Sequence, residues 1–132
     1  MSEPGSVGYA FNRTRQAYLA TQLSIAATHW SRLRGLMCTE ADSFRAGQGL
    51  WIVPSRGVHT FAMRFPIDVL YLNEEKTVVH LEQDLKPWRV APVRMQAASV
   101  IELPRNMLHS TGTSLGDEIE IVLGQAREAS TQ

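Results

Sequence analysis

Cysteine is nearly absent from this sequence, because Cys38 is the only one among 132 residues. A single cysteine cannot form a disulfide within the chain, so the fold does not depend on an oxidising compartment. No family-type pattern of cysteine and histidine surrounds Cys38, and we interpret it as a small hydrophobic residue instead of a nucleophile.

Net charge is also absent, since 13 basic and 13 acidic side chains cancel. Nucleic-acid binding draws much of its affinity from a positive surface, so we predict no nucleic-acid partner. Apolar runs stay far below the 18 residues of a membrane span, and the start of the chain lacks the basic and apolar regions of a secretion signal. We therefore expect a cytoplasmic protein without a membrane span.

Motifs for cofactors and metals are missing as well. The sequence contains no G-x-S-x-G motif, which argues against the nucleophile elbow of an α/β-hydrolase. It also contains no G-x-G-x-x-G or G-x-x-x-x-G-K-[ST] motif, which argues against the common nucleotide-binding loops. The four histidines, at positions 29, 59, 80 and 109, are scattered and do not form the short pairs of a zinc site. We predict no cofactor and no metal.

The residues that are present suit one folded domain. Hydrophobic residues make up 44% and charged residues 20%, which is ordinary for a globular protein. Small and polar residues at both ends predict tails over 1–8 and 124–132, with a single domain over 9–123. Oligomeric state cannot be deduced from these properties.

Short apolar or alternating runs, separated by polar turns and prolines, predict a β-rich fold. The clearest helical stripe, at Trp30, Leu33 and Met37, predicts one short helix over 28–37. We therefore expect the α+β class, mainly antiparallel, with a rolled or barrel-like sheet. The predicted strands cover 18–27, 50–53, 59–64, 67–72, 77–81, 98–103 and 118–123.

Asp68 is the most informative polar residue, because it lies in a predicted strand with apolar residues on both faces. A carboxyl group in such a place must find partners or lose its charge. Arg34, beside the stripe of the predicted helix, is the natural candidate. We predict that Arg34 and Asp68 form a polar pair that holds the helix to the sheet.

Two other carboxyl groups have simpler interpretations. Glu102 takes the face opposite Ile101 and Leu103 in its predicted strand, and we expect that face to contact solvent. Asp117 follows Gly116 and is most simply a turn residue.

A long irregular segment over 83–96 combines Trp88 with prolines and three cations. Long loops in compact domains often carry function, and an indole near arginines can stack on a ligand. His59, at the start of a predicted strand, is the histidine that we expect to face a pocket. The candidate binding residues are His59, Met63, Arg64 and Trp88.

Several motifs, in order along the chain, resemble the uncharacterised DUF192 family, also called UPF0127. The resemblance covers about 19–123 and implies a small β-rich domain from a bacterium or archaeon, with no established activity. Ala62 and Arg64 stand where the family commonly has an aromatic residue and a lysine. The matching segments are Arg34–Met37, Gly49–Ile52, His59–Met63, Pro66–Leu70, Val100–Pro104 and Gly116–Asp117, so Arg34, Met63, Asp68, Glu102 and Asp117 occupy family motif positions.

We interpret the chain as a non-enzymatic binding or interaction domain for an unidentified small molecule or protein. Two alternatives stay open. The first is a small hydrolase-like or lyase-like enzyme that uses Asp68 or Glu102 with His59. The second is a structural partner-binding module, which predicts an exposed apolar patch instead of a pocket.

Overall fold

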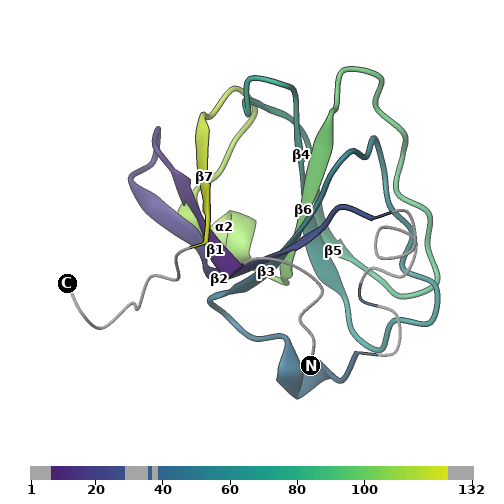
Figure 1. Ribbon diagram of the computed structural model, residues 1–132. Helices are drawn as coiled ribbons and strands as arrows, with labels where there is room; N and C mark the ends of the chain where they lie inside the picture. Colours follow the sequence, from purple (N-terminus) through teal and green to yellow (C-terminus); the bar gives the residue numbers. More distant parts are fainter. Residues whose placement is uncertain (1–6, 29–35, 37–38, 125–132) are drawn as a thin grey trace.

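Seven strands pair into one curled sheet in the computed structural model, which describes residues 7–28, 36 and 39–124. The order across the sheet is β5-β4-β6-β3-β2-β1-β7, and Figure 1 shows it as a half-barrel. Every strand pair is antiparallel except β2 with β3. The strands are β1 (Val7–Asn12), β2 (Ala17–Ala26), β3 (Gln48–Ile52), β4 (Ile67–Leu72), β5 (Val78–Leu85), β6 (Ser99–Pro104) and β7 (Ile119–Leu123).

The two edge strands, β5 and β7, approach each other at one end of the curled sheet. The amide of Val78 donates to the carbonyl of Asp117 at 2.9 Å, and the amide of Ile119 donates to the carbonyl of Lys76 at the same distance. Backbone groups at the start of both edges are therefore paired, which limits their availability to another chain.

One short helix, α2 (Met107–Thr111), follows β6 and packs against β2 and β4. A 3₁₀ turn, η1 (Ala41–Ser43), precedes β3. The predicted β-rich α+β fold with a rolled sheet is thus confirmed. The helix predicted over 28–37 lies almost entirely outside the described residues, as do Arg34 and Cys38.

Strand β4 is buried on both faces, as its continuous apolar pattern predicts. Ile67, Val69 and Tyr71 enter one core cluster, while Leu70 and Leu72 enter another on the opposite face. The first core cluster also contains Phe44, Met63, Ala91 and Ala97, and the second contains Leu108 of α2. The turn over 73–77 joins β4 to β5 as the predicted hairpin.

The prediction of a strand over 59–64 is wrong. Only His59 forms a β-bridge, with Val90, and the chain then turns at Phe61 and Ala62, where the φ of Ala62 is 59°. A left-handed residue interrupts the extended backbone that a strand needs. This segment therefore forms part of a loop, and the strand partners of β4 are β5 and β6.

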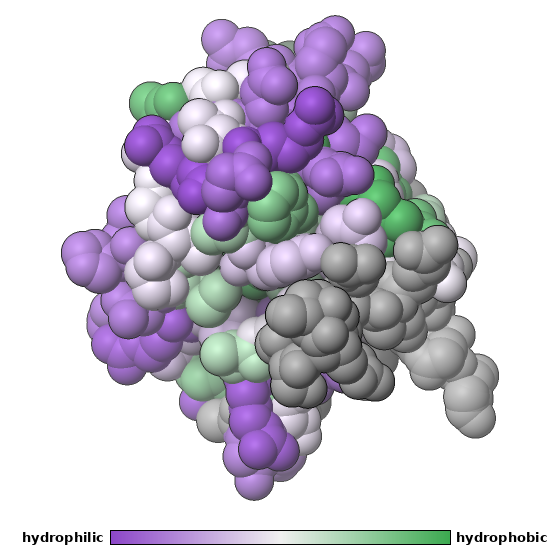
Figure 2. All heavy atoms as spheres, turned by 90° about the vertical axis from the view of Figure 1, so that its left-hand side faces the viewer, coloured by the Kyte–Doolittle hydropathy of each residue, from purple (hydrophilic) through white to green (hydrophobic). Residues whose placement is uncertain are grey.

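The side of the sheet formed by β1, β2 and β7 is mainly hydrophilic, with small apolar areas scattered among polar residues (Figure 2). Isolated apolar residues of this kind are normal on a protein surface. No helix within the described residues has the length and apolar character needed to cross a membrane.

Candidate functional site

Two loops, over 55–63 and 86–97, lie side by side on the flank of the molecule away from β1, β2 and β7 (Figure 1). The amide of Thr60 donates to the carbonyl of Arg89, and the amide of Ala91 donates to the carbonyl of Val58. These bonds frame the His59–Val90 bridge and set which residues face outward.

Thr60 holds the two loops together. Its buried hydroxyl donates to the carbonyl of Lys86 at 2.6 Å and accepts from the amide of Arg89 at 2.8 Å. Its carbonyl also accepts from the amide of Trp88. These bonds satisfy polar backbone groups that the loops would otherwise leave exposed or unpaired, and they fix the position of Trp88.

Three rings stack along the outer face of the paired loops. The rings of His59 and Phe61 are 4.9 Å apart between centroids, and those of Phe61 and Trp88 are 5.9 Å apart. Both pairs are near parallel, with interplanar angles of 29° and 25°. The Nδ1 atom of His59 accepts from the amide of Phe61, which orients the imidazole in the stack.

The two paired loops carry several exposed apolar side chains. Phe61 is 40% exposed and Trp88 is 64% exposed, although residues of this size normally bury most of their surface. Val90, Val93 and Met95 are more than 60% exposed. We call this set the ridge: His59, Phe61, Trp88, Val90, Val93 and Met95.

Backbone strain accompanies the ridge. Trp88 has a φ of 63° and Ala62 a φ of 59°, both in the left-handed region that non-glycine residues rarely occupy. Such conformations cost about 1–3 kcal/mol each and persist only where surrounding contacts enforce them. The bonds around Thr60 supply that constraint at Trp88.

The four predicted binding residues have different surroundings. His59 and Trp88 both belong to the ridge and are connected through Phe61. Met63 is only 4% exposed and packs in the first core cluster. Arg64 is exposed and forms an ion pair with Glu40 at 2.5 Å. The structure therefore brings two of the four together and gives Met63 a place in the core.

Asp68 is fully buried and uses both oxygens. Oδ1 accepts from the amide of Asp84 in β5, and Oδ2 accepts from the amide of Leu108 in the first turn of α2, each at 2.9 Å. The amide of Leu108 belongs to the group of helix donors that have no partner within the helix. Asp68 thus ties α2 to the sheet, while its predicted partner, Arg34, is outside the described residues.

Glu102 is 1% exposed, so the expectation that it faces solvent is wrong. It lies opposite Leu50 in β3 and Val69 in β4, so its side chain shares the face that the first core cluster covers. Its Oε1 atom has no hydrogen-bond partner in the described part of the chain. Burial disfavours the charged form and raises the pKa of Glu102 to about 8.

Asp117 is also more than a turn residue. Its Oδ2 atom accepts from Asn12 Nδ2, Arg15 Nε and the amide of Ser114, each at 2.9–3.0 Å. Burial raises the pKa of this carboxyl, but the bonds from Arg15, Asn12 and Ser114 outweigh burial, and the net pKa is lowered. The network connects the β1–β2 turn to the start of β7.

Replacing Asp117 with alanine is expected to cost about 2 kcal/mol, because Asn12 and the amide of Ser114 lose a buried acceptor. A lowered carboxyl pKa stabilises the fold above the unfolded value and stops doing so as the pH falls through the folded value. Denaturant unfolding from pH 6 down to about pH 3 checks both points. Equal pH slopes for wild type and Asp117→Ala would contradict them.

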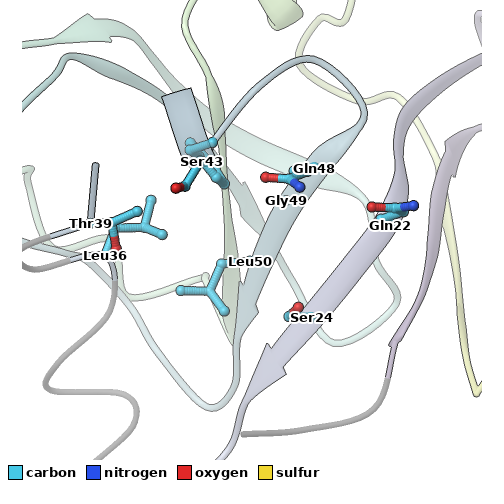
Figure 3. Close-up of a pocket in the computed structure, with 9 residues that line it drawn as sticks. Gln22, Ser24, Leu36, Thr39, Ser43, Gln48, Gly49 and Leu50 are labelled. Carbon is cyan, nitrogen blue, oxygen red and sulfur yellow. The ribbon is translucent and has the colours of Figure 1, made fainter. Parts of the chain in front are cut away.

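A separate pocket of about 260 Å³ lies between β2, β3 and residues 36, 39, 43 and 44. Figure 3 shows Ser24 and Leu50 at one side of this pocket and Thr39 and Ser43 at the other. Its lining combines neutral polar side chains with Leu36, Phe44 and Leu50, and it contains none of the predicted site residues. Leu50 lies between Ser24 of β2 and Glu102 of β6 in the sheet, and Leu50 and Ser24 line the pocket.

The residues proposed for acid–base chemistry do not meet. The hydrogen bond of His59 is to Phe61, both oxygens of Asp68 accept from backbone amides, and Glu102 is enclosed in the core. Among the residues that the structure describes, no group of three histidine, cysteine or carboxylate side chains could hold a metal ion.

Sequence reasoning did not identify Phe61, Val90, Val93 or Met95 as site residues. Phe61 was assigned to a strand, where an aromatic residue usually packs in a core. The available signal was the run over 86–97, in which apolar residues alternate with cations instead of following a strand pattern. That run has no obvious buried face, which is consistent with its exposure.

Comparisons with known proteins agree with the resemblance noted from the motifs. A UPF0127 protein of Thermococcus sibiricus is 30% identical over 123 residues, covering 89% of this chain and 77% of the relative. A UPF0127 protein of Pyrococcus furiosus is 40% identical over 63 residues, covering 48% of this chain and 53% of the relative. Neither name carries an activity.

Two solved structures share the fold. A protein of unknown function from Novosphingobium aromaticivorans has a TM-score of 0.72 at 16% identity, covering 86% of this chain and 83% of that one. A putative transcription regulator from Sinorhizobium meliloti has a TM-score of 0.74 at 20% identity, covering 91% and 98%. The DUF192 family profile, described as "Uncharacterized ACR, COG1430", matches residues 10–121, and this chain therefore belongs to the DUF192 family.

Proposed function

We propose that this protein is a non-catalytic recognition module that binds a partner through the ridge. The observation that carries the proposal is the ring stack of His59, Phe61 and Trp88, with Phe61 and Trp88 exposed, together with exposed Val90, Val93 and Met95 on the same loop as Trp88. Exposed apolar area costs roughly 25 cal/mol per Å², and a partner that covered it would recover that free energy. Exposed large apolar side chains that gather on neighbouring loops commonly mark an interaction site.

The backbone supports the same proposal. Trp88 is held at a positive φ by hydrogen bonds to Thr60 and is still 64% exposed. The strained backbone leaves most of the indole in solvent, with a stack on Phe61 as its ring contact among the described residues. A rigid, exposed indole is the type of residue that dominates the binding energy of protein interfaces.

Selection of peptides from a random display library tests this function. Immobilised full-length wild type is expected to enrich a common peptide motif, and Trp88→Ala is expected to weaken binding of the enriched peptides about 30-fold, as for an interface hot spot. The matched control is Leu115→Ala, because Leu115 is 65% exposed but lies outside the ridge.

The control variant should bind the selected peptides as wild type does. A library that enriches no peptide on wild type would contradict the proposal. So would a motif that Trp88→Ala and wild type bind with equal affinity.

A further inference from the structure

We infer, on the basis of the proposed function, that the ridge takes an acidic peptide segment in which apolar side chains are interspersed with aspartate or glutamate. The inference names the chemistry of the partner from the charges around the ridge. It goes beyond the proposed function, which requires only an apolar partner.

Charge is unevenly distributed in this chain although the total is zero. The segments over 55–66 and 86–98 contain five of the 13 basic residues and none of the 13 acidic ones. The five are Arg56, Arg64, Lys86, Arg89 and Arg94. Glu74 and Glu75 of the β4–β5 turn line the same hollow as Arg56 and Met95, so the charge there is balanced. The cationic part of the ridge is therefore the loop that carries Arg89 and Arg94, and its positive charge attracts and orients anionic partners.

Two of these cations are neutralised within the fold. Arg64 pairs with Glu40, and Lys86 pairs with Asp84 at 2.6 Å. The other three, at positions 56, 89 and 94, form no ion pair with any described residue. They are the cations that a partner's carboxylates could meet without displacing an internal contact.

Two of the three unpaired cations alternate with ridge residues along the chain. Arg89 lies between Trp88 and Val90, and Arg94 lies between Val93 and Met95. An apolar–cation–apolar sequence is repeated in the loop over 86–97. A partner that covers both kinds of side chain needs apolar groups and carboxylates at comparable spacing, which an acidic peptide provides.

The apolar composition favours a peptide over a single-stranded nucleic acid. Val90, Val93 and Met95 are aliphatic and 63–72% exposed, and they offer no stacking surface to a base. Base recognition by such surfaces depends on free aromatic faces. Here the aromatic rings of His59, Phe61 and Trp88 already stack on one another.

Fluorescence anisotropy with labelled peptides tests the inference on the full chain. Three peptides of about 12 residues share tryptophan and leucine at fixed positions and differ only in the remaining positions, which are glutamate, serine or lysine. We expect the glutamate peptide to bind at least about tenfold more tightly than the serine peptide at about 50 mM salt, with most of that difference lost at about 500 mM.

Variants that remove arginine charges test the inference, and one of them serves as the matched control. Arg89→Gln with Arg94→Gln should bring the glutamate peptide to within about threefold of the serine peptide, since two of the three unpaired cations, the two that are neighbours of ridge residues in the chain, are removed. Arg13→Gln, at an exposed arginine on the β1–β2 turn, should leave the preference intact. Thermal unfolding of each variant verifies that the fold is retained.

Serine and glutamate peptides of equal affinity would overturn the inference and leave the proposed function standing. Failure of the glutamate peptide to bind would also overturn it, while the display selection with Trp88→Ala decides the proposed function separately. A thymidine oligonucleotide of about 12 residues that binds more tightly than the glutamate peptide would overturn the acidic-peptide assignment in favour of nucleic acid.

Discussion

Replacing Glu102 with glutamine is expected to stabilise the protein by roughly 4 kcal/mol at pH 8 and to change little near pH 4. Glutamine keeps the shape of the side chain but cannot ionise. The cost that it removes is that of a buried carboxyl whose pKa is raised to about 8 by the surrounding core. Above the ordinary pKa of a glutamate, the unfolded chain releases this proton. The folded protein must then either keep the proton or hold a charged carboxyl in its core, and both lower its stability relative to the unfolded chain.

The direction follows from proton binding in the two states. Between the ordinary value of 4.5 and about 8, the folded protein keeps the Glu102 proton while the unfolded chain loses it. Folding stability therefore falls as the pH rises through this window, by about 1.4 kcal/mol per pH unit at the steepest, and levels off above the folded pKa.

Urea unfolding of wild type and Glu102→Gln at intervals from pH 4 to pH 9 measures the difference. The gap between the two curves should widen with pH and reach a plateau. Glu75→Gln is the matched control, because Glu75 is exposed on the β4–β5 turn. Parallel curves for wild type and Glu102→Gln would show that Glu102 carries its charge in the folded state without penalty.

Replacing Asp68 with alanine is expected to cost roughly 4 kcal/mol. The amides of Asp84 and Leu108 would lose their acceptors in a dry environment, and the cost of two unsatisfied donors adds to that of the cavity. Asp68→Asn should cost about half as much, because its amide retains one acceptor oxygen for one of the two donors.

Denaturant unfolding gives the two costs, and amide hydrogen exchange locates the effect. Exchange at Leu108 should accelerate more than exchange in β1, since Asp68 contacts α2 directly. Asp42→Asn, at an exposed position in η1, is the control and should leave stability within about 0.5 kcal/mol of wild type. Uniformly faster exchange would mean that Asp68 does not anchor α2 specifically.

Much of the sheet was predictable because its signals are local. The turn over 73–77 lies between two apolar runs, which is enough to predict the β4–β5 hairpin. The continuous apolar pattern of β4 predicts burial on both faces, and it also predicts that Asp68 needs partners there. The identity of those partners was not predictable, because backbone amides of Asp84 and Leu108 carry no sequence signature.

The surroundings of Glu102 and of the ridge depend on contacts between distant segments. Glu102 is buried because residues distant in sequence, Leu36, Phe44 and Met63 among them, belong to the core cluster on its face of β6, and no pattern within β6 reveals that cover. The bridge between His59 and Val90 joins residues that are 31 positions apart in different loops, and the neighbouring Trp88 has a positive φ. Sequence alone could name His59 and Trp88 as candidates but could not place Phe61 between them.

The central claim is that the ridge is the binding surface, and NMR titration tests it most directly. A peptide from the display selection would be added to ¹⁵N-labelled full-length protein, with the Trp88 indole signal assigned through Trp88→Phe. We predict shifts of that indole and of amides over 58–61 and 88–95, with little change in β1 and β7. Shifts confined to β1, β2 and β7, or an unperturbed Trp88 indole in the presence of bound peptide, would contradict the claim.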